Sequence, residues 1–361
     1  MAGTAFPQML AAYKQAVDDD IAAYAKYVRT VTRQQYGEYA ALEVDTFLDI
    51  LSRGGKRIRG VLVMAGYEMC GGQNRAMVTQ AARAIEMFHA YLLMCDDIQD
   101  RSPLRRGKPS AHELLATYHR RHHLKGDAQT AGVNLALNAA MAGAHAAQVV
   151  LANMDADPQL KLNAISITNR TLGITEHGQT YDIMNELVDS PTEEDLQRTL
   201  EWKTAQYSFV NPLHVGMVLA GAGCESTDAI TPFARHLGKA FQIVDDLLGV
   251  FGTEAELGKS PLDDIREGKG TLLTHYALKH AAPADATFLR QCLGNAKLTR
   301  TAFTRCQKII EASGARKYAE ALAREETSAA LAGLEAGKHL WNTTGHAFLE
   351  GLAQYVSGRS R

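Results

Sequence analysis

Apolar residues recur at helical spacing along the whole sequence. In run after run they stand at positions i, i+3, i+4 and i+7, which places them on one face of an α-helix. The alternation of apolar and polar residues that marks strands is nearly absent, and proline occurs only nine times in 361 residues. This pattern predicts an all-α protein.

Short stretches rich in glycine and proline separate the predicted helices. These turn signals are Gly54-Gly55, Gly71-Gly72, Ser102-Pro103, Asp157-Pro158, Ser190-Pro191 and Lys259-Ser260-Pro261. The helices predicted between them cover residues 7–35, 42–52, 57–70, 75–99, 110–121, 128–152, 159–187, 192–206, 208–221, 228–251, 271–281, 297–312, 314–332 and 336–356. No low-complexity linker divides the chain, so we expect residues 1–361 to form one helical domain.

Two segments carry further local signals. The helix predicted at 128–152 is apolar nearly all round and rich in small residues, which predicts a central helix surrounded by others. The run Ser190-Pro191-Thr192-Glu193-Glu194 predicts a helix start, because Pro and Thr favour the first positions and acidic residues favour the first turn.

Composition excludes several classes of protein. The net charge of −2 gives no reason to expect nucleic acid or an anionic membrane as a partner. The five cysteines are scattered without metal-ligand spacing, which is typical of reduced thiols. The first twenty residues lack the pattern of a signal peptide, and no uninterrupted apolar run reaches about 18 residues. We therefore expect a cytoplasmic protein without an integral membrane segment.

The stretch from Met87 to Pro109 carries the first chemical signal. An apolar helical run ends at Asp96, Asp97 and Asp100, and Arg105 and Arg106 follow after a short loop. Residues four apart share a helix face, so Asp96 and Asp100 point the same way and repel unless a cation lies between them. Carboxylates suit Mg²⁺, and guanidinium groups suit phosphate. The stretch indicates a metal–diphosphate site, although a solvated helix end has the same residues.

Residues 240–271 repeat this arrangement. An apolar helical run ends at Asp245 and Asp246, and Gln242 lies about one turn before them. The charged residues that follow, in a loop punctuated by glycine, are Lys259, Asp263, Asp264 and Lys269. One such stretch alone would suit a charged surface loop. Two of them, about 150 residues apart, predict that both bind Mg²⁺ ions around one diphosphate if they face each other across a bundle.

Six landmarks then resemble, in order, those of the polyprenyl synthetase family of trans-isoprenyl diphosphate synthases. They are Gly54-Gly55-Lys56-Arg57-Ile58-Arg59, Asp96-Asp97-Ile98-Gln99-Asp100, Arg105-Arg106-Gly107-Lys108-Pro109, Gly178-Gln179-Thr180-Tyr181-Asp182, Lys203-Thr204 and Phe241-Gln242-Ile243-Val244-Asp245-Asp246. The resemblance implies a single large helical bundle of the isoprenoid synthase type with a central active-site cavity. The tail of the second motif, Gly258-Lys259 and Glu267-Gly268-Lys269, resembles actinobacterial-type members.

The reaction implied is head-to-tail (1′-4) condensation of isopentenyl diphosphate with an allylic diphosphate. The allylic diphosphate ionises, isopentenyl diphosphate attacks the cation, and a proton is lost. Several Mg²⁺ ions are implied, held by Asp96 and Asp100 on one side and Asp245 on the other. By the same resemblance Asp97, Asp246 and Gln242 contribute directly or through water, and Asp264 matches the loop aspartate of the family.

The resemblance also assigns the substrate contacts. The residues implied for the allylic diphosphate are Arg105, Lys203 and Lys259, and Lys269 is implied as a further substrate-binding residue. Those implied for isopentenyl diphosphate are Lys56, Arg59, His89 and Arg106, although solvated charges and a core histidine would show the same residue types. Thr204 and Gln179 are expected to stabilise the cation through their oxygen dipoles, and the proton is expected to leave with the departing diphosphate.

Three features depart from the family or lie outside its motifs. Gly249 stands where many members have a third aspartate, and the Gly-Asp pair expected near residue 134 is not obvious in Ala131-Gly132-Val133-Asn134. His119, His122 and His123 cluster beside two arginines where a helix is expected to end. Zinc is conceivable there, but the setting favours a solvated turn.

Product length is predicted from the helix that carries Asp96. Tyr91 lies five residues before Asp96, about 7.5 Å along a helix. Leu92, four residues before Asp96, is smaller and leaves more room. One aromatic at the fifth position, without an insertion in the first motif, resembles geranylgeranyl (C20) synthases. If Tyr91 is only a core residue, longer products follow, and a farnesyl synthase is the shorter alternative.

Two other functions share parts of this pattern. A class I terpene cyclase has the same architecture but lacks the isopentenyl pocket and has a different second metal motif. A non-catalytic subunit of a heteromeric synthase usually loses an aspartate motif, and both are present here. The family likeness also implies a homodimer.

Overall fold

The computed structural model describes residues 5–253 and 261–358, and the all-α prediction is confirmed. Within the described residues the one sheet is a two-stranded antiparallel pair, in which Leu104 lies opposite Pro109 and Arg105 opposite Lys108. Contacts divide the chain into two compact units. The first runs up to Ile165 and includes Val215–Gly221, and the second comprises Ser166–His214 and the residues from Ala222 onward. The single-domain organisation stays a prediction.

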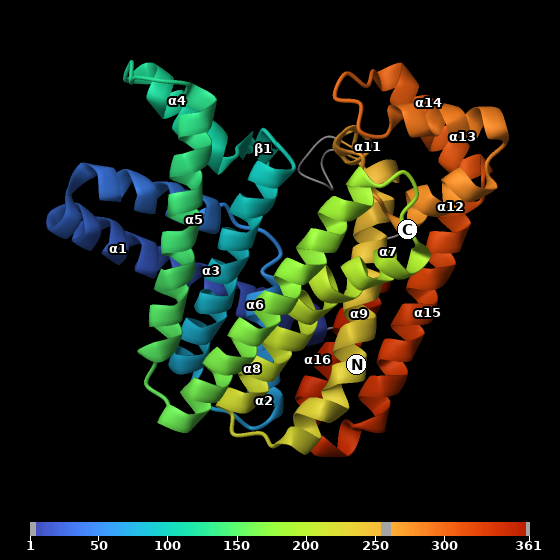
Figure 1. Cartoon of the computed structure of the whole chain (residues 1–361). Helices are drawn as coiled ribbons and strands as arrows, with labels where there is room; N and C mark the ends of the chain where they lie inside the picture. Colours follow the sequence, from blue (N-terminus) through green and yellow to red (C-terminus); the bar gives the residue numbers. More distant parts are fainter. Residues whose placement is uncertain (1–4, 254–260, 359–361) are drawn as a thin grey trace. The chain divides into compact units, whose positions relative to one another are not determined.

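The first unit is built around α3. Its elements are α1 (Ala5–Ser52), α2 (Ile58–Met69), α3 (Arg75–Gln99), β1 (Leu104–Arg105), β2 (Lys108–Pro109), α4 (Ala111–Arg121), α5 (Ala128–Ala152) and the beginning of α6 (Pro158–Leu187). α3 packs against α1, α2 and α5, and α4 packs against α5 (Figure 1). The side chain of Asn74 caps α3 by accepting a hydrogen bond from the Met77 amide.

α1 contains the break expected between residues 35 and 42. Gly37 lies there with φ 81° and ψ −172°, a conformation outside the helical region. Only glycine adopts this backbone geometry without a steric cost, so Gly37 lets the chain turn between two helical segments. Both segments contribute buried side chains, among them Val17 and Leu48.

The prediction that the helix at 128–152 is fully surrounded is wrong. The small residues of α5 pack inward, but four larger apolar side chains are 37–57% exposed. These are Leu135, Leu137, Met141 and Val149. α5 is also the one helix in the described part of the chain that is long and apolar enough to cross a membrane. A third of its most apolar 18-residue stretch is buried inside the protein.

The second unit is built around α9 (Cys224–Phe251). The other elements are the remainder of α6, α7 (Glu193–Thr199), η2 (Leu200–Val210), the beginning of α8 (Asn211–Leu219), α11 (Asp263–Glu267), α12 (Leu272–His280), α13 (Pro283–Cys292), α14 (Arg300–Ala312), α15 (Ala315–Ala336), η3 (Lys338–Leu340) and α16 (Thr343–Gly358). α9 packs along α15 and also against η2 and α16 (Figure 1). A buried apolar cluster that includes Val244, Leu247 and Ile265 joins α9 to α11 and α12.

The second unit departs from prediction in two places. The chain from Leu200 to Val210 forms a π-helix that continues directly into α8, so the break expected at 207 is absent. α11 and α13 were not predicted, because each is short and polar. The predicted helix start is confirmed: Thr192 caps α7, and Glu193, Glu194 and Asp195 occupy its first turn.

Candidate functional site

The first acidic group lies at the C-terminal end of α3. Asp96 and Asp97 are in the last helical turn, and Asp100 is the C-cap, with its amide bonded to the Asp96 carbonyl at 2.8 Å. Asp96 and Asp100 are partly exposed, whereas Asp97 is fully buried. The helix therefore places two accessible carboxylates on one face, as the i, i+4 spacing predicts.

Arg105 on β1 faces these carboxylates. Its Nε donates to Asp97 Oδ1 at 2.8 Å, and its Nη2 donates to Asp97 and, at 3.3 Å, to Asp96 Oδ2. Burial raises the pKa of Asp97, although the Arg105 guanidinium opposes this shift. Asp97 Oδ2 is buried without a hydrogen-bond partner among the described residues. Arg105 thus fixes the orientation of the acidic group.

Arg53 holds the β1–β2 hairpin in place, a role that the sequence did not reveal. Its guanidinium donates to the carbonyl oxygens of Arg105 at 3.0 Å and Pro109 at 2.8 Å, and it pairs with Asp49 at 2.6 Å. The Arg53 side chain is only 2% exposed. The i, i+4 pair with Asp49 was visible in the sequence, but the contact with the hairpin was not.

Arg57 anchors the loop between α1 and α2. Its backbone is left-handed (φ 52°), and its side chain is buried. The guanidinium donates to Asp18 at 2.8 Å, to Glu86 at 3.2 Å and to the Leu51 carbonyl at 2.8 Å. Glu86 also accepts from the Gly60 amide at 2.9 Å. This network fixes the backbone on both sides of Lys56 and Arg59.

A basic group forms beside this loop. Arg59 Nη1 lies 3.1 Å from His89 Nε2. Arg106 bonds to the Gly54 carbonyl, and a side chain at Gly55 would come within 2.9 Å of the Arg106 guanidinium. Burial, followed by the charge of Arg59, holds the pKa of His89 well below its usual value. Burial and the neighbouring arginines lower the pKa of Arg106 to about 10.

The remaining candidates of the first unit lie on the same elements. Lys56 is exposed in the loop that Arg57 anchors. Tyr91 and Leu92 are half-buried on α3, which is continuously helical from them to Asp96. The spacing used to predict product length therefore holds in the structure.

In the second unit, η2 carries Lys203 and Thr204. Gly178 on α6 lies directly against it, because a Cβ at Gly178 would overlap the Lys203 amide and lie 2.7 Å from the carbonyl carbon of Trp202. Lys203 Nζ pairs with Asp182 Oδ2 at 2.5 Å. The motif Gly178-Gln179-Thr180-Tyr181-Asp182 thus supplies both the close approach and the counter-ion for Lys203. Gln179 is half-buried next to this contact.

Gln242 connects η2 to the second acidic group. Its amide oxygen accepts from Thr204 Oγ1 at 2.9 Å, and its amide nitrogen donates to Asp246 Oδ1 at 2.8 Å. The sequence placed Gln242 near Asp245, and the structure shows that its hydrogen bond goes to Asp246, one full turn along α9. Asp245 follows Gln242 by three residues and is half-buried.

Asp246, in the second unit, lies in a buried and acidic environment. Burial, together with Asp264 and Asp245, raises the pKa of Asp246 to about 8. Within the described residues no three His, Cys, Asp or Glu side chains are close enough to hold one ion by themselves. One or two carboxylates are enough for Mg²⁺, because this ion keeps several waters and takes phosphate oxygens as further ligands. The partly exposed carboxylates of this kind are Asp96 and Asp100 in the first unit and Asp245 in the second.

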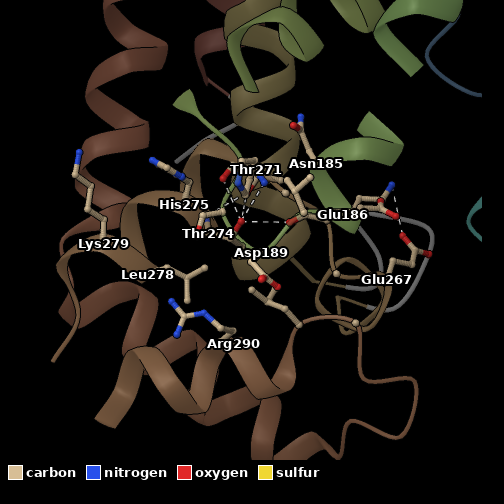
Figure 2. Close-up of a pocket in the computed structure, with 18 residues that line it drawn as sticks. Asn185, Glu186, Asp189, Glu267, Thr271, Thr274, His275, Leu278, Lys279 and Arg290 are labelled. Atoms are coloured by element: carbon tan, nitrogen blue, oxygen red, sulfur yellow. Dashed lines mark hydrogen bonds and ion pairs between the residues drawn. The ribbon is translucent and has the colours of Figure 1, made fainter. Parts of the chain in front are cut away.

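Lys269 lies between α11 and α12 beside a cavity. Its ammonium pairs with Glu267 at 3.4 Å. The cavity has a volume of about 490 Å³, and Figure 2 shows Glu267, Thr271, Asn185 and Arg290 around it. Neither Asp245 nor Asp246 is among the described residues that line it. Lys259, which the resemblance assigns to the allylic diphosphate, lies outside the described residues.

The histidine cluster at the end of α4 is a structural turn. His119 is buried and contacts the Lys125 carbonyl at 3.0 Å, so it is not solvated as predicted. His122 is exposed and stacks on Tyr118, and His123 has a left-handed backbone (φ 49°). Lys125 supplies only a carbonyl oxygen, and the described residues contain no metal-binding group here.

Known proteins are similar to this chain over most of its length. The Polyprenyl synthetase family model matches residues 43–310. A geranylgeranyl diphosphate synthase of Saccharolobus solfataricus is 32% identical over 90% of this chain and 92% of its own length. An octaprenyl diphosphate synthase of Escherichia coli is 29% identical over 86% of this chain and 88% of its own length. A further match is the crystal structure of a geranylgeranyl pyrophosphate synthase of Corynebacterium glutamicum, complexed with isoprenyl diphosphate and magnesium. Its TM-score is 0.90, and it is 30% identical over 96% of this chain and 98% of its own.

Proposed function

Because the chain belongs to the polyprenyl synthetase family and is a prenyl diphosphate synthase, we propose that it condenses isopentenyl diphosphate with allylic diphosphates to make geranylgeranyl diphosphate. The allylic substrate would be dimethylallyl, geranyl or farnesyl diphosphate. Relatives named for C20 products, and the length of α3 between Tyr91 and Asp96, support this product.

One observation carries the proposal: the first unit contains an acidic group and a separate basic group, which suit a diphosphate in two different ways. Asp96, Asp97 and Asp100 form an acidic group that would bind a diphosphate through Mg²⁺. Arg59, His89 and Arg106 form a basic group that would bind a diphosphate without a metal ion. The reaction needs this difference, because the allylic diphosphate must ionise and isopentenyl diphosphate must stay intact.

Separate residues would bind the metal ions, the leaving diphosphate and isopentenyl diphosphate. Mg²⁺, bound by Asp96, Asp100 and Asp245, would neutralise the leaving diphosphate. Arg105 and Lys203 would hold that diphosphate, with Lys203 positioned by Asp182. The neutral His89 would keep Arg59 in place for isopentenyl diphosphate.

Three residues of the second unit would act near the cation. Thr204 and Gln242 are hydrogen-bonded to each other, so their oxygen dipoles have fixed directions. Gln179 would add a further oxygen dipole. No protein base is assigned, since the departing diphosphate would accept the proton.

Product analysis tests the chain-length proposal. Purified protein, supplied with isopentenyl and farnesyl diphosphates, should release mainly a C20 diphosphate. Tyr91→Ala should extend the product by one or more isoprene units, and Leu92→Ala should extend it less. Products of unchanged length from Tyr91→Ala would show that Tyr91 is not the wall.

A homodimer and a cytoplasmic location complete the proposal. The exposed apolar side of α5, with Met141 and Val149 at 49% and 57% exposure, is a face that a second copy of α5 would cover. Such a dimer contact would also explain why the exposed side of α5 is apolar as well as its buried side. The five cysteines are free thiols in the structure, which fits a reducing compartment.

A further inference from the structure

The turn between α4 and α5 presents a compact positively charged surface (Figure 1). All residues from 120 to 127 are exposed, and Leu124 is 46% exposed. We call four of these side chains the cationic turn: Arg120, Arg121, Leu124 and Lys125. The net charge of −2 is an average over the whole chain and conceals this local excess of positive charge.

No carboxylate neutralises the three cations of this turn. Among the described residues Arg120, Arg121 and Lys125 form no ion pair, and Arg120 instead donates to Thr117 Oγ1 at 3.1 Å. The one acidic residue between positions 120 and 127 is Asp127, and its carboxylate caps α5. It accepts from the amide and the hydroxyl group of Thr130 at 2.8 Å each. The three cations can therefore pair with a partner.

The backbone of the cationic turn is held in one conformation. The buried His119 side chain contacts the Lys125 carbonyl at 3.0 Å, and the His119 carbonyl accepts from the Leu124 amide at 3.2 Å. The amide of His123, whose backbone is left-handed, donates to the Arg120 carbonyl at 3.3 Å. A partner would not have to order this backbone, which lowers the entropy cost of binding.

An exposed leucine among cations suits an anionic lipid surface. Lys and Arg are attracted to lipid phosphates, and an apolar side chain beside them can enter the boundary between head groups and acyl chains. Nucleic acid is a poorer match, because its binding proteins follow the backbone with many phosphate contacts and reach the bases with polar or aromatic side chains. Leu124 would have no role on such a partner.

From this arrangement we propose that the cationic turn docks the protein on a membrane surface that contains anionic phospholipids. Arg120, Arg121 and Lys125 bind the lipid phosphates, and Leu124 inserts between the head groups. The contact is peripheral and needs no helix that crosses the bilayer. Docking brings the protein to the phase into which prenyl chains partition, and only this consequence rests on the proposed function.

Sedimentation of the full chain with lipid vesicles tests the proposal. The protein should sediment with vesicles that contain phosphatidylglycerol and phosphatidylcholine, and it should stay in solution with vesicles of phosphatidylcholine alone. Raising the salt concentration from about 0.1 M to about 1 M shortens the Debye length from about 10 Å to about 3 Å and should release the protein.

A triple variant tests the three cations. Arg120→Gln combined with Arg121→Gln and Lys125→Gln should weaken binding to the anionic vesicles about 100-fold, since each basic residue near such a surface contributes about fivefold.

A second triple variant controls for the total charge. Lys297→Gln, Lys308→Gln and Lys317→Gln together remove the same formal charge from exposed sites in the second unit. This protein should sediment with anionic vesicles like the wild type. All six replaced side chains are exposed, so both variants should keep the wild-type melting temperature. An equal loss of binding in the two variants would overturn the inference.

Leu124→Ser tests the apolar part of the contact. It should weaken vesicle binding by about tenfold or less and leave the salt dependence unchanged. Binding as tight as that of the wild type would overturn the insertion of Leu124.

Two results with the wild type would overturn the docking itself. One is a protein that stays in solution with anionic vesicles at low salt. The other is a protein that binds a short DNA duplex under the same conditions and not the vesicles. Neither result affects the proposed function, because consumption of isopentenyl diphosphate is measured without vesicles.

Discussion

At the scale of single residues, the candidate site depends on side chains that touch no substrate. Arg53 fixes the hairpin that carries Arg105, and Arg57 fixes the loop that carries Lys56 and Arg59. Both side chains are buried, so their charges are compensated by specific partners and not by water.

Removing Arg57 should destabilise the protein strongly. Arg57→Met leaves the buried Glu86 carboxylate without its ionic partner, which typically costs about 3–5 kcal/mol. Urea denaturation measures the free energy of unfolding. Arg29→Met, which breaks an exposed pair with Asp45, is the control and should cost less than about 1 kcal/mol. Equal losses in the two variants would contradict the buried network.

His89 should make stability depend on pH. Its pKa is lowered in the folded protein, so the unfolded chain takes up a proton first as the pH falls. Stability from this group is therefore present above the ordinary histidine pKa of about 6.5 and is lost below it. The melting temperature of His89→Gln should fall less between pH 7 and pH 5 than that of the wild type. An identical decline in both proteins would show that His89 does not contribute.

At the scale of elements, close helix contacts place the functional side chains. Gly178 brings α6 against η2, and Gly238 on α9 does the same from another element, because a Cβ there would lie 2.8 Å from the Ala205 Cβ. A π-helix has wider turns than an α-helix and is frequent at functional sites. The two glycines pack on the stretch of η2 that presents Lys203 and Thr204.

Gly178→Ala should therefore disturb the site and the fold together. The added methyl group overlaps the backbone of η2, and overpacking of this kind costs about 1–3 kcal/mol. Prenyl transfer should fall as Lys203 moves away from Asp182. Gly173→Ala, on the same helix with open space around it, is the control and should stabilise the protein by about 0.5–1 kcal/mol. Chemical denaturation measures the loss of stability, and kcat measures the loss of prenyl transfer. A Gly178→Ala protein with wild-type stability and kcat would contradict the close contact.

The sequence predicted those features that lie within one contiguous motif. The acidic helix end at Asp96, the capped start at Thr192 and the all-α class follow from spacing and local preference. The roles of Arg53 and Arg57 could not be predicted, because their partners lie on other elements. The π-helix has the residue pattern of an α-helix, and the contact between Asp264 and Gly249 forms only after α11 has folded onto α9.

At the scale of the whole molecule, the exposed side of α5 predicts self-association. Light scattering after size-exclusion chromatography should show a dimer. Met141→Glu combined with Val149→Glu should shift it toward monomers, because charges in an apolar interface cannot be paired. Leu187→Glu, at an exposed site on α6, should leave the dimer intact. A monomeric wild type would contradict this assignment of α5.

In the proposed function, carboxylates of both units serve one Mg²⁺-dependent reaction. The most direct measurement is transfer of radiolabelled isopentenyl diphosphate to farnesyl diphosphate, with and without Mg²⁺, by the wild type, Asp96→Asn and Asp245→Asn. We predict a labelled C20 diphosphate that forms only with Mg²⁺ and falls about 100-fold or more in either variant. Label transferred without Mg²⁺, or at the wild-type rate by either variant, would contradict the proposed Mg²⁺-dependent reaction.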